Sequence, residues 1–169
     1  MTQYKYYFLS LILVIADQLT KLMVLGFLEL YESIEITSFF SLTHVHNYGA
    51  AFSFLADEDG WQQYFLVSIS MIASIAIILW MKKTSINQPY KLIALSLILS
   101  GAIGNLIDRA VFGFVIDFIN LHYQDFYWPV FNVADMAITL GLILLLSVSY
   151  THLRAHETPE HLVCRLLLE

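Results

Sequence analysis

The sequence predicts a mainly α-helical integral membrane protein, a four-transmembrane-helix bundle with a small extracytoplasmic β-sheet between spans one and two. Composition is the first observation behind this prediction. The 169 residues are 59% hydrophobic and 13% charged, with a mean hydropathy of +0.70, whereas soluble domains carry about 25% charged residues. The second observation is that four apolar runs approach the ~20 residues that cross a bilayer core of ~30 Å as a helix.

The four expected spans cover residues 6–28, 64–81, 92–107 and 128–150, which places residues 1–148 in a single membrane-embedded domain. The second span carries no charge, and the third is short, with Gly101 and Gly104 near its end. The first apolar run contains Asp17 and Lys21 and ends without a small-residue cleavage site. We therefore interpret it as a retained anchor rather than a cleaved signal peptide.

Charged residues beside the spans predict the orientation. Lysines lie before the first span and between the second and third, at Lys5, Lys82, Lys83 and Lys91. The segment between the first two spans is acidic, with Glu29, Glu32, Glu35, Asp57, Glu58 and Asp59. By the positive-inside rule both termini are expected to be cytoplasmic. Residues 29–63 and 110–127 then face outward, which in a bacterium is the periplasmic side of the inner membrane.

The outer segment 30–55 predicts the small sheet. Residues 33–37 alternate in polarity and residues 39–45 are rich in β-forming side chains, as in half-buried strands. His44 and His46 are expected on one face of a strand. The sequence has no His-Glu-x-x-His pattern, so we expect no metal site and no cofactor. The sequence contains no cluster of lysines and arginines that would predict nucleic-acid binding. Its single cysteine, Cys164, excludes an internal disulfide.

Polar residues gather at the outer ends of spans three and four, at Asn105, Asp108, Arg109, Asp117, Asn132 and Asp135. Carboxylates within a membrane are unfavourable by ~2.5–3.5 kcal/mol each at mid-helix, so chains that carry them usually use them. Because residues 110–127 are expected to form a short loop, spans three and four should be neighbours, with Asp117 beside Asp135. Two carboxylates that meet at a membrane surface favour an aspartyl pair that activates water.

Each of these residues also has a structural interpretation. Asp108 is better explained by an ion pair with Arg109 at the rim of the membrane than by catalysis. Asn132 fits a helix-packing hydrogen bond and an active-site role equally well. Asp17 and Lys21 are four residues apart and form a self-neutralising pair on one helix. Alternative functions for the same acids are a small transporter or proton-conducting protein, or a non-catalytic assembly factor.

Five segments in fixed order carry a family resemblance: DQLTK at 17–21, NYGAAF at 47–52, GNLIDR at 104–109, VIDF at 115–118 and FNVAD at 131–135. Together they resemble the bacterial lipoprotein signal peptidases, or signal peptidase II, over roughly residues 5–147. The resemblance implies a membrane aspartic endopeptidase that removes the signal peptide from prolipoproteins, cutting before a diacylglyceryl-modified cysteine. It also implies inhibition by cyclic peptide antibiotics. We expect membrane lipids as further partners and a monomeric protein.

The resemblance also assigns roles to individual residues. It implies that Asp117 and Asp135 are the catalytic pair. The positions matching the substrate site are Asn47, Gly49, Asn105, Arg109 and Asn132. The positions matching structural support are Asp17, Lys21, Asp108 and Gly104.

The last residues of the chain differ in character from the rest. Residues 149–169 lack the expected basic ending and resemble a translated sequencing-adapter fragment. We interpret this tail, which contains Cys164, as a sequence artefact that replaces the natural C-terminus. The alternative is a genuine cytoplasmic tail.

Overall fold

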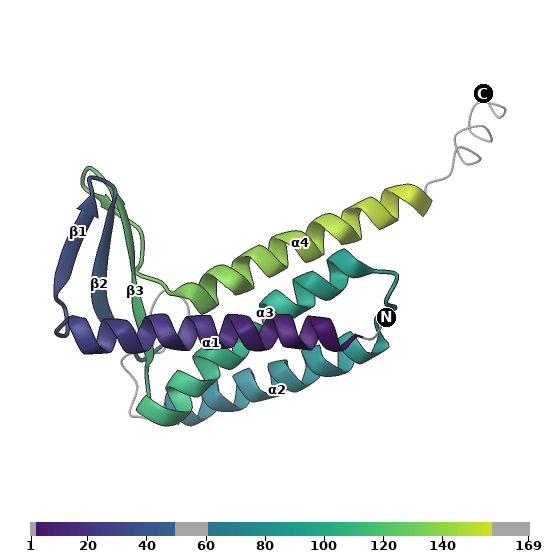
Figure 1. Cartoon of the computed structure of the whole chain (residues 1–169), viewed down its shortest axis with the longest axis horizontal. Coiled ribbons are helices and arrows are strands. Elements are labelled where there is room, and N and C mark those ends of the chain that lie inside the picture. Colours follow the sequence, from purple (N-terminus) through teal and green to yellow (C-terminus); the bar gives the residue numbers. More distant parts are fainter. Residues whose placement is uncertain (1–2, 50–60, 157–169) are drawn as a thin grey trace.

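The computed structural model describes residues 3–49 and 61–156, without the side chains of the last seven. In chain order its elements are α1 (Tyr4–Phe27), β1 (Ser33–Thr37), β2 (Phe40–Asn47), α2 (Trp61–Lys83), α3 (Pro89–Phe112), β3 (Val115–Tyr123), β4 (Phe126–Tyr127) and α4 (Val133–His156). Figure 1 shows the sheet at one end of the helices, beside the end of α1 that is remote from the N-terminus. The mainly helical prediction is confirmed.

Length and composition allow three of the described helices, α1, α2 and α3, to cross a membrane. The apolar part of α4 is shorter, from Val133 to Ser149. Large apolar side chains such as Phe8, Ile72 and Leu142 are about half exposed or more. Contiguous exposed apolar surface of this kind marks a lipid or protein contact, so the helices present a lipid-compatible exterior.

The central helix is α3, which packs against α1, α2 and α4. Glycines allow its closest contacts. A Cβ atom on Gly101 would overlap the carbonyl oxygen of Ala134, and one on Gly104 would lie 2.5 Å from the Asp17 carboxylate. The two glycines therefore allow α1 and α4 to approach α3 closely.

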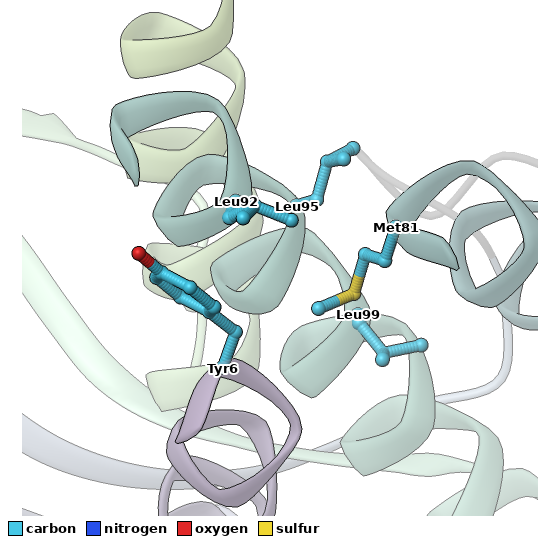
Figure 2. Close-up of a cluster of buried hydrophobic side chains, with 5 residues drawn as sticks. All are labelled: Tyr6, Met81, Leu92, Leu95 and Leu99. Carbon is cyan, nitrogen blue, oxygen red and sulfur yellow. The ribbon is translucent and has the colours of Figure 1, made fainter. Parts of the chain in front are cut away.

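Two apolar clusters fix the ends of the bundle. Figure 2 shows the first, in which Tyr6 of α1 and Met81 of α2 meet Leu92, Leu95 and Leu99 of α3. The second cluster joins the last turn of α1 to β3 through Val24, Leu28, Ile116 and Phe118. Because this second cluster lies where α1 ends, it packs the sheet directly against the helices.

The sheet is antiparallel with the order β1-β2-β3-β4. Its second half corrects the prediction that residues 110–127 form a loop, because β3 and β4 lie in this segment. Gly113 ends α3 with a φ of +83°, a left-handed conformation that glycine adopts without steric penalty. The chain therefore turns at once from α3 into β3, which pairs with β2 along most of its length.

The boundaries of two spans also differ from the prediction. The third was expected at 92–107, but α3 runs from Pro89 to Phe112 because the polar residues of its last turns have buried partners. The fourth was expected from residue 128, but α4 begins at Val133. Proline at position 129 cannot donate a backbone hydrogen bond, and Phe131 bridges to Ile119 of β3 instead.

Some predicted features lie outside the described residues. They are the end of the NYGAAF segment, the acidic residues at positions 57–59, and positions 157–169 of the tail. The helix α4 continues to His156, six residues past the expected end of the fourth span.

Candidate active site

The first turn of α4 positions Asp135. The side-chain Oδ1 of Asn132 accepts a hydrogen bond from the Asp135 backbone N–H at 2.9 Å. In return, Asp135 Oδ2 accepts from the Asn132 backbone N–H at 3.4 Å. This reciprocal arrangement is a capping box in which asparagine is the cap. Asp135 is the third residue of the helix, where the unpaired amides and the helix dipole favour negative charge.

Strand β3 positions Asp117, which is only 2% exposed. Its Oδ2 accepts a hydrogen bond from Asn47 Nδ2 at 2.9 Å. Its Oδ1 accepts from Asn132 Nδ2 at 2.6 Å. Because Asn47 ends β2 and Asn132 caps α4, the Asp117 carboxylate is held by two elements distant in sequence.

Asn105 of α3 completes the link between the two acids. Its Nδ2 donates to Asp135 Oδ1 at 2.8 Å, and its Oδ1 accepts from Asn132 Nδ2 at 3.3 Å. Asn132 thus contacts Asp117, Asn105 and the backbone of Asp135 while it caps the helix. The two interpretations of Asn132 as a structural and as an active-site residue therefore describe the same side chain.

The surroundings of Asp117 alter its proton affinity. Burial and the nearby charge of Asp135 raise the pKa of Asp117 to about 7, although the hydrogen bonds from Asn47 and Asn132 oppose the shift. Because a second negative charge beside Asp135 is unfavourable, Asp117 can carry a proton near neutral pH. The site can therefore present one acid and one base together.

A buried ion cluster lies beneath the acids. Lys21 Nζ is 2.9 Å from Asp17 Oδ2 and 2.8 Å from Asp108 Oδ2, and all three residues are at most 1% exposed. Lys21 also donates to Asn105 Oδ1 at 3.1 Å. The expected pair of Asp17 with Lys21 is present, but the expected ion pair of Asp108 with Arg109 is replaced by one with Lys21. The reason is that Asp108 faces α1 inside the bundle rather than the rim.

The ion cluster also holds the backbone beside each acid. Asp17 Oδ1 accepts a hydrogen bond from the Ala134 N–H at 2.9 Å, next to Asp135. Asp108 Oδ2 accepts from the Ile116 N–H at 3.2 Å, next to Asp117. Sequence reasoning missed Gln18, which donates to Asp108 Oδ1 at 2.8 Å. Its position beside Asp17 in DQLTK was the available signal.

Arg109 lies on the cavity side of α3. Its Nη2 donates to the Gly49 carbonyl oxygen at 3.0 Å, and Gly49 N–H donates to Asn47 Oδ1 at 3.0 Å. Its Nε is buried and has no hydrogen-bond partner within the described part of the chain. The guanidinium of Arg109 lies close enough for its positive charge to act on Asp135 and Asp117. It therefore places a charged hydrogen-bond donor beside the two acids.

A cavity of about 750 Å³ opens beside these groups. Its polar wall contains both acids with Asn47, Asn105 and Arg109. Most of the remaining wall is apolar and comes from α2, α3, the first residue of β3, α4 and the segment before α4: Leu66, Ile69, Ala73, Ala102, Val115, Trp128, Pro129, Val130, Phe131, Met136, Ile138 and Leu140. Apolar cavities with a few convergent polar groups are typical ligand sites. Sequence reasoning missed residues 128–131 as part of this wall, having placed them in a helix.

Comparisons with known proteins identify relatives over most of the chain. The family model described as signal peptidase (SPase) II matches residues 9–151. A lipoprotein signal peptidase of Pseudoalteromonas atlantica is 48% identical over 141 residues, covering 83% of this chain and 86% of the relative. A lipoprotein signal peptidase of Francisella tularensis subsp. novicida is 44% identical over 146 residues, covering 86% of this chain and 91% of the relative.

A solved structure has the same fold. It is described as a bacterial membrane enzyme determined by the in meso method at 2.3 Å resolution, and it aligns with a TM-score of 0.80 at 29% identity over 91% of this chain and 92% of its own. The transporter interpretation gains no support from any of these relatives. The chain is a multi-pass membrane protein and belongs to the signal peptidase II family, the lipoprotein signal peptidases.

Proposed function

We propose that this chain is an aspartic endopeptidase that removes the signal peptide from diacylglyceryl-modified prolipoproteins, cutting before the lipidated cysteine. The observation that carries the proposal is the network in which asparagine side chains join Asp117 and Asp135 at the wall of an apolar cavity. The family match and the names of the relatives support the same substrate class.

In the proposed mechanism Asp135 is the general base and Asp117 the general acid. Asp135 is the more exposed carboxylate and lies in the first turn of a helix, where negative charge is favoured. It takes a proton from water as the water oxygen bonds to the scissile carbonyl carbon, and Asp117 gives its proton to the carbonyl oxygen. When the C–N bond breaks, Asp135 returns its proton to the leaving amine and Asp117 recovers one from the hydroxyl group.

The polar wall is proposed to hold the peptide and the apolar wall the lipid. Asn47, Gly49 and Arg109 lie next to the acids and offer groups for the substrate backbone. The apolar lining suits acyl chains that stay in the bilayer. Cyclic peptide antibiotics are proposed to occupy the same cavity, and the enzyme is proposed to act as a monomer.

The proposed location is the bacterial inner membrane, with both termini cytoplasmic and the acids facing the periplasm. Lys82 and Lys83 end α2 at the side of the molecule remote from the sheet. Lys91 lies in the first turn of α3 beside Trp80, 5.4 Å from its ring. Basic residues on one side favour a cytoplasmic placement of that side.

A defined cleavage assay tests the function. The full chain, purified in detergent, is incubated with one prolipoprotein prepared with and without the diacylglyceryl group, and the products are identified by mass spectrometry. We expect cleavage of the lipidated form alone, with a product that begins at the modified cysteine. Equal cleavage of both forms, or cleavage elsewhere, would contradict the proposed specificity.

The pH dependence follows from Asp117. Because the acid must be protonated and its pKa is about 7, we expect kcat/KM to decline as the pH rises through 7. This parameter reports the ionisation of the free enzyme, so it is measured at substrate concentrations below KM on both sides of neutrality. A value of kcat/KM that increases through this range would show that the acid and base are assigned the wrong way round.

A further inference from the structure

Two histidines on β2 form a direct pair that the proposed chemistry does not use. His44 Nε2 and His46 Nε2 are 3.1 Å apart, and the His44 Nδ1 is 3.1 Å from the carbonyl oxygen of Leu28, just after α1. His44 is 4% exposed. His46 stacks on Phe114 with ring centroids 3.6 Å apart. The pair therefore connects β2 to the end of α1 and to the start of β3.

The contacts define where the protons lie. A carbonyl oxygen only accepts hydrogen bonds, so His44 Nδ1 carries a hydrogen. In the neutral pair, His44 Nε2 must then accept, and His46 Nε2 must donate to it. A single added proton can be shared across this contact. A second added proton would place two N–H groups against each other and break the contact.

The histidine pair lies on the face of β2 opposite to Asn47, the residue that donates a hydrogen bond to Asp117. Successive side chains of a strand point to opposite faces, so His44 and His46 share the face that packs on α1, with Ile116 opposite His46. Asn47, the next residue, belongs to the other face and donates to Asp117 Oδ2. A shift of β2 away from α1 would therefore move Asn47 relative to Asp117.

Within residues 3–49 and 61–156, few other titratable groups face the pair. The edge of the Tyr48 ring meets His46 with centroids 6.4 Å apart, and Asp117 of β3 lies opposite Val45 on the other face. In the turn after α1, Glu32 caps the backbone N–H of Glu29 with its own carboxylate. Burial, followed by the charge of His44, lowers the pKa of His46. The folded protein thus binds protons here less readily than the unfolded chain, and stability is lost as the pH falls below the usual histidine range.

We infer that His44 and His46 are positioning residues for the acids: a proton-sharing pair that locks β2 against the end of α1 and so holds Asn47 against Asp117. The inference rests on the proposed function, because Asn47 matters only if Asp117 reacts. It gives the sheet a specific part in catalysis, since its α1-facing side maintains the geometry on its cavity side.

Side-chain NMR of the full chain tests the pairing without any activity. ¹⁵N-labelled histidine signals are followed during acid titration, with His122 as an internal reference because it stacks on Tyr127 of β4, away from the pair. We expect the signals of His44 and His46 to change together in two coupled steps, the first for a proton shared by the pair and the second, at lower pH, for the loss of their contact. Independent titration of both residues alongside His122 would overturn the inference.

Two substitutions test the positioning. His46→Gln keeps a polar group near the Nε2 position but cannot ionise. The ratio of its kcat/KM to that of the wild type should therefore rise as the pH falls to where the second proton breaks the wild-type contact. His44→Phe removes both hydrogen bonds and should lower kcat/KM by roughly five- to tenfold at neutral pH, the equivalent of about one neutral hydrogen bond. It should also shift the Asn47 side-chain amide signals. The matched control His122→Gln should change neither the ratio nor these signals.

The outcomes separate this inference from the proposed function. If the wild type fails to cleave lipidated prolipoprotein, the function is wrong, but the titration and the Asn47 signals still decide the pairing and the positioning. If the wild type cleaves but the His46→Gln ratio is flat with pH and the Asn47 signals are unchanged in His44→Phe, the positioning role is wrong while the function stands.

Discussion

Asp117→Asn and Asp135→Asn are each expected to lower kcat/KM by roughly 10³–10⁴-fold, the upper part of the range for loss of a positioned acid or base. Asparagine preserves the shape of each side chain but can neither take a proton from water nor give one to the substrate. Because the two residues act as a unit, the double variant should be little worse than either single variant. The measurement is the rate at which each variant cleaves lipidated prolipoprotein, over a range of substrate concentrations that saturates the wild-type enzyme.

Stability and a matched substitution distinguish lost chemistry from lost folding. The pKa of Asp117 is raised to about 7, so its ionisation opposes folding as the pH rises through that value. Asp117→Asn should therefore unfold at a higher temperature than the wild type in alkaline buffer. Asp125→Asn, at an exposed turn between β3 and β4, should retain full activity. An active Asp117→Asn or Asp135→Asn enzyme would refute the aspartic mechanism.

The meeting of the two acids could be predicted because helix geometry and topology bring the outer ends of consecutive spans to one level. The elements that hold Asp117 could not be predicted from the sequence. Asn47 lies 70 positions before Asp117, and the pairing of β2 with β3 depends on where α3 ends. Residues 110–127 were therefore expected to form a loop, although the apolar run around Asp117 is the buried strand that places it.

Two further differences between the prediction and the structure arise in the same way, because local sequence patterns do not show which distant segments meet. Local spacing revealed the Asp17 and Lys21 pair, because four residues make one helix turn, but it gave no sign that Asp108 approaches from α3. An apolar run also cannot distinguish a helix from a buried extended segment by periodicity alone. Residues 128–131 were therefore assigned to a span, whereas they cover the cavity and leave Asn132 free to cap α4.

Lys21→Met is expected to destabilise the protein by about 3–5 kcal/mol, the usual effect of removing one partner from a buried ion cluster. Methionine fills a similar volume, but it leaves Asp17 and Asp108 buried without their cation. The matched control is Lys82→Met at the exposed end of α2, which should leave stability unchanged. Thermal or denaturant unfolding in one detergent measures both variants.

Neutralising the carboxylates as well should separate stability from catalysis. In the triple variant Lys21→Met, Asp17→Asn, Asp108→Asn the ion cluster carries no charge, so much of the lost stability should return. The two introduced asparagine side chains can still accept from the Ala134 and Ile116 amides, which keeps the backbone beside both acids in place.

Catalysis should not recover with stability. Asn105 loses the Lys21 ammonium that holds its Oδ1, and its amide is then free to flip away from Asp135. We therefore expect a folded protein with reduced kcat and a nearly unchanged KM. Recovery of stability together with full activity would mean that the ion cluster supports only the fold.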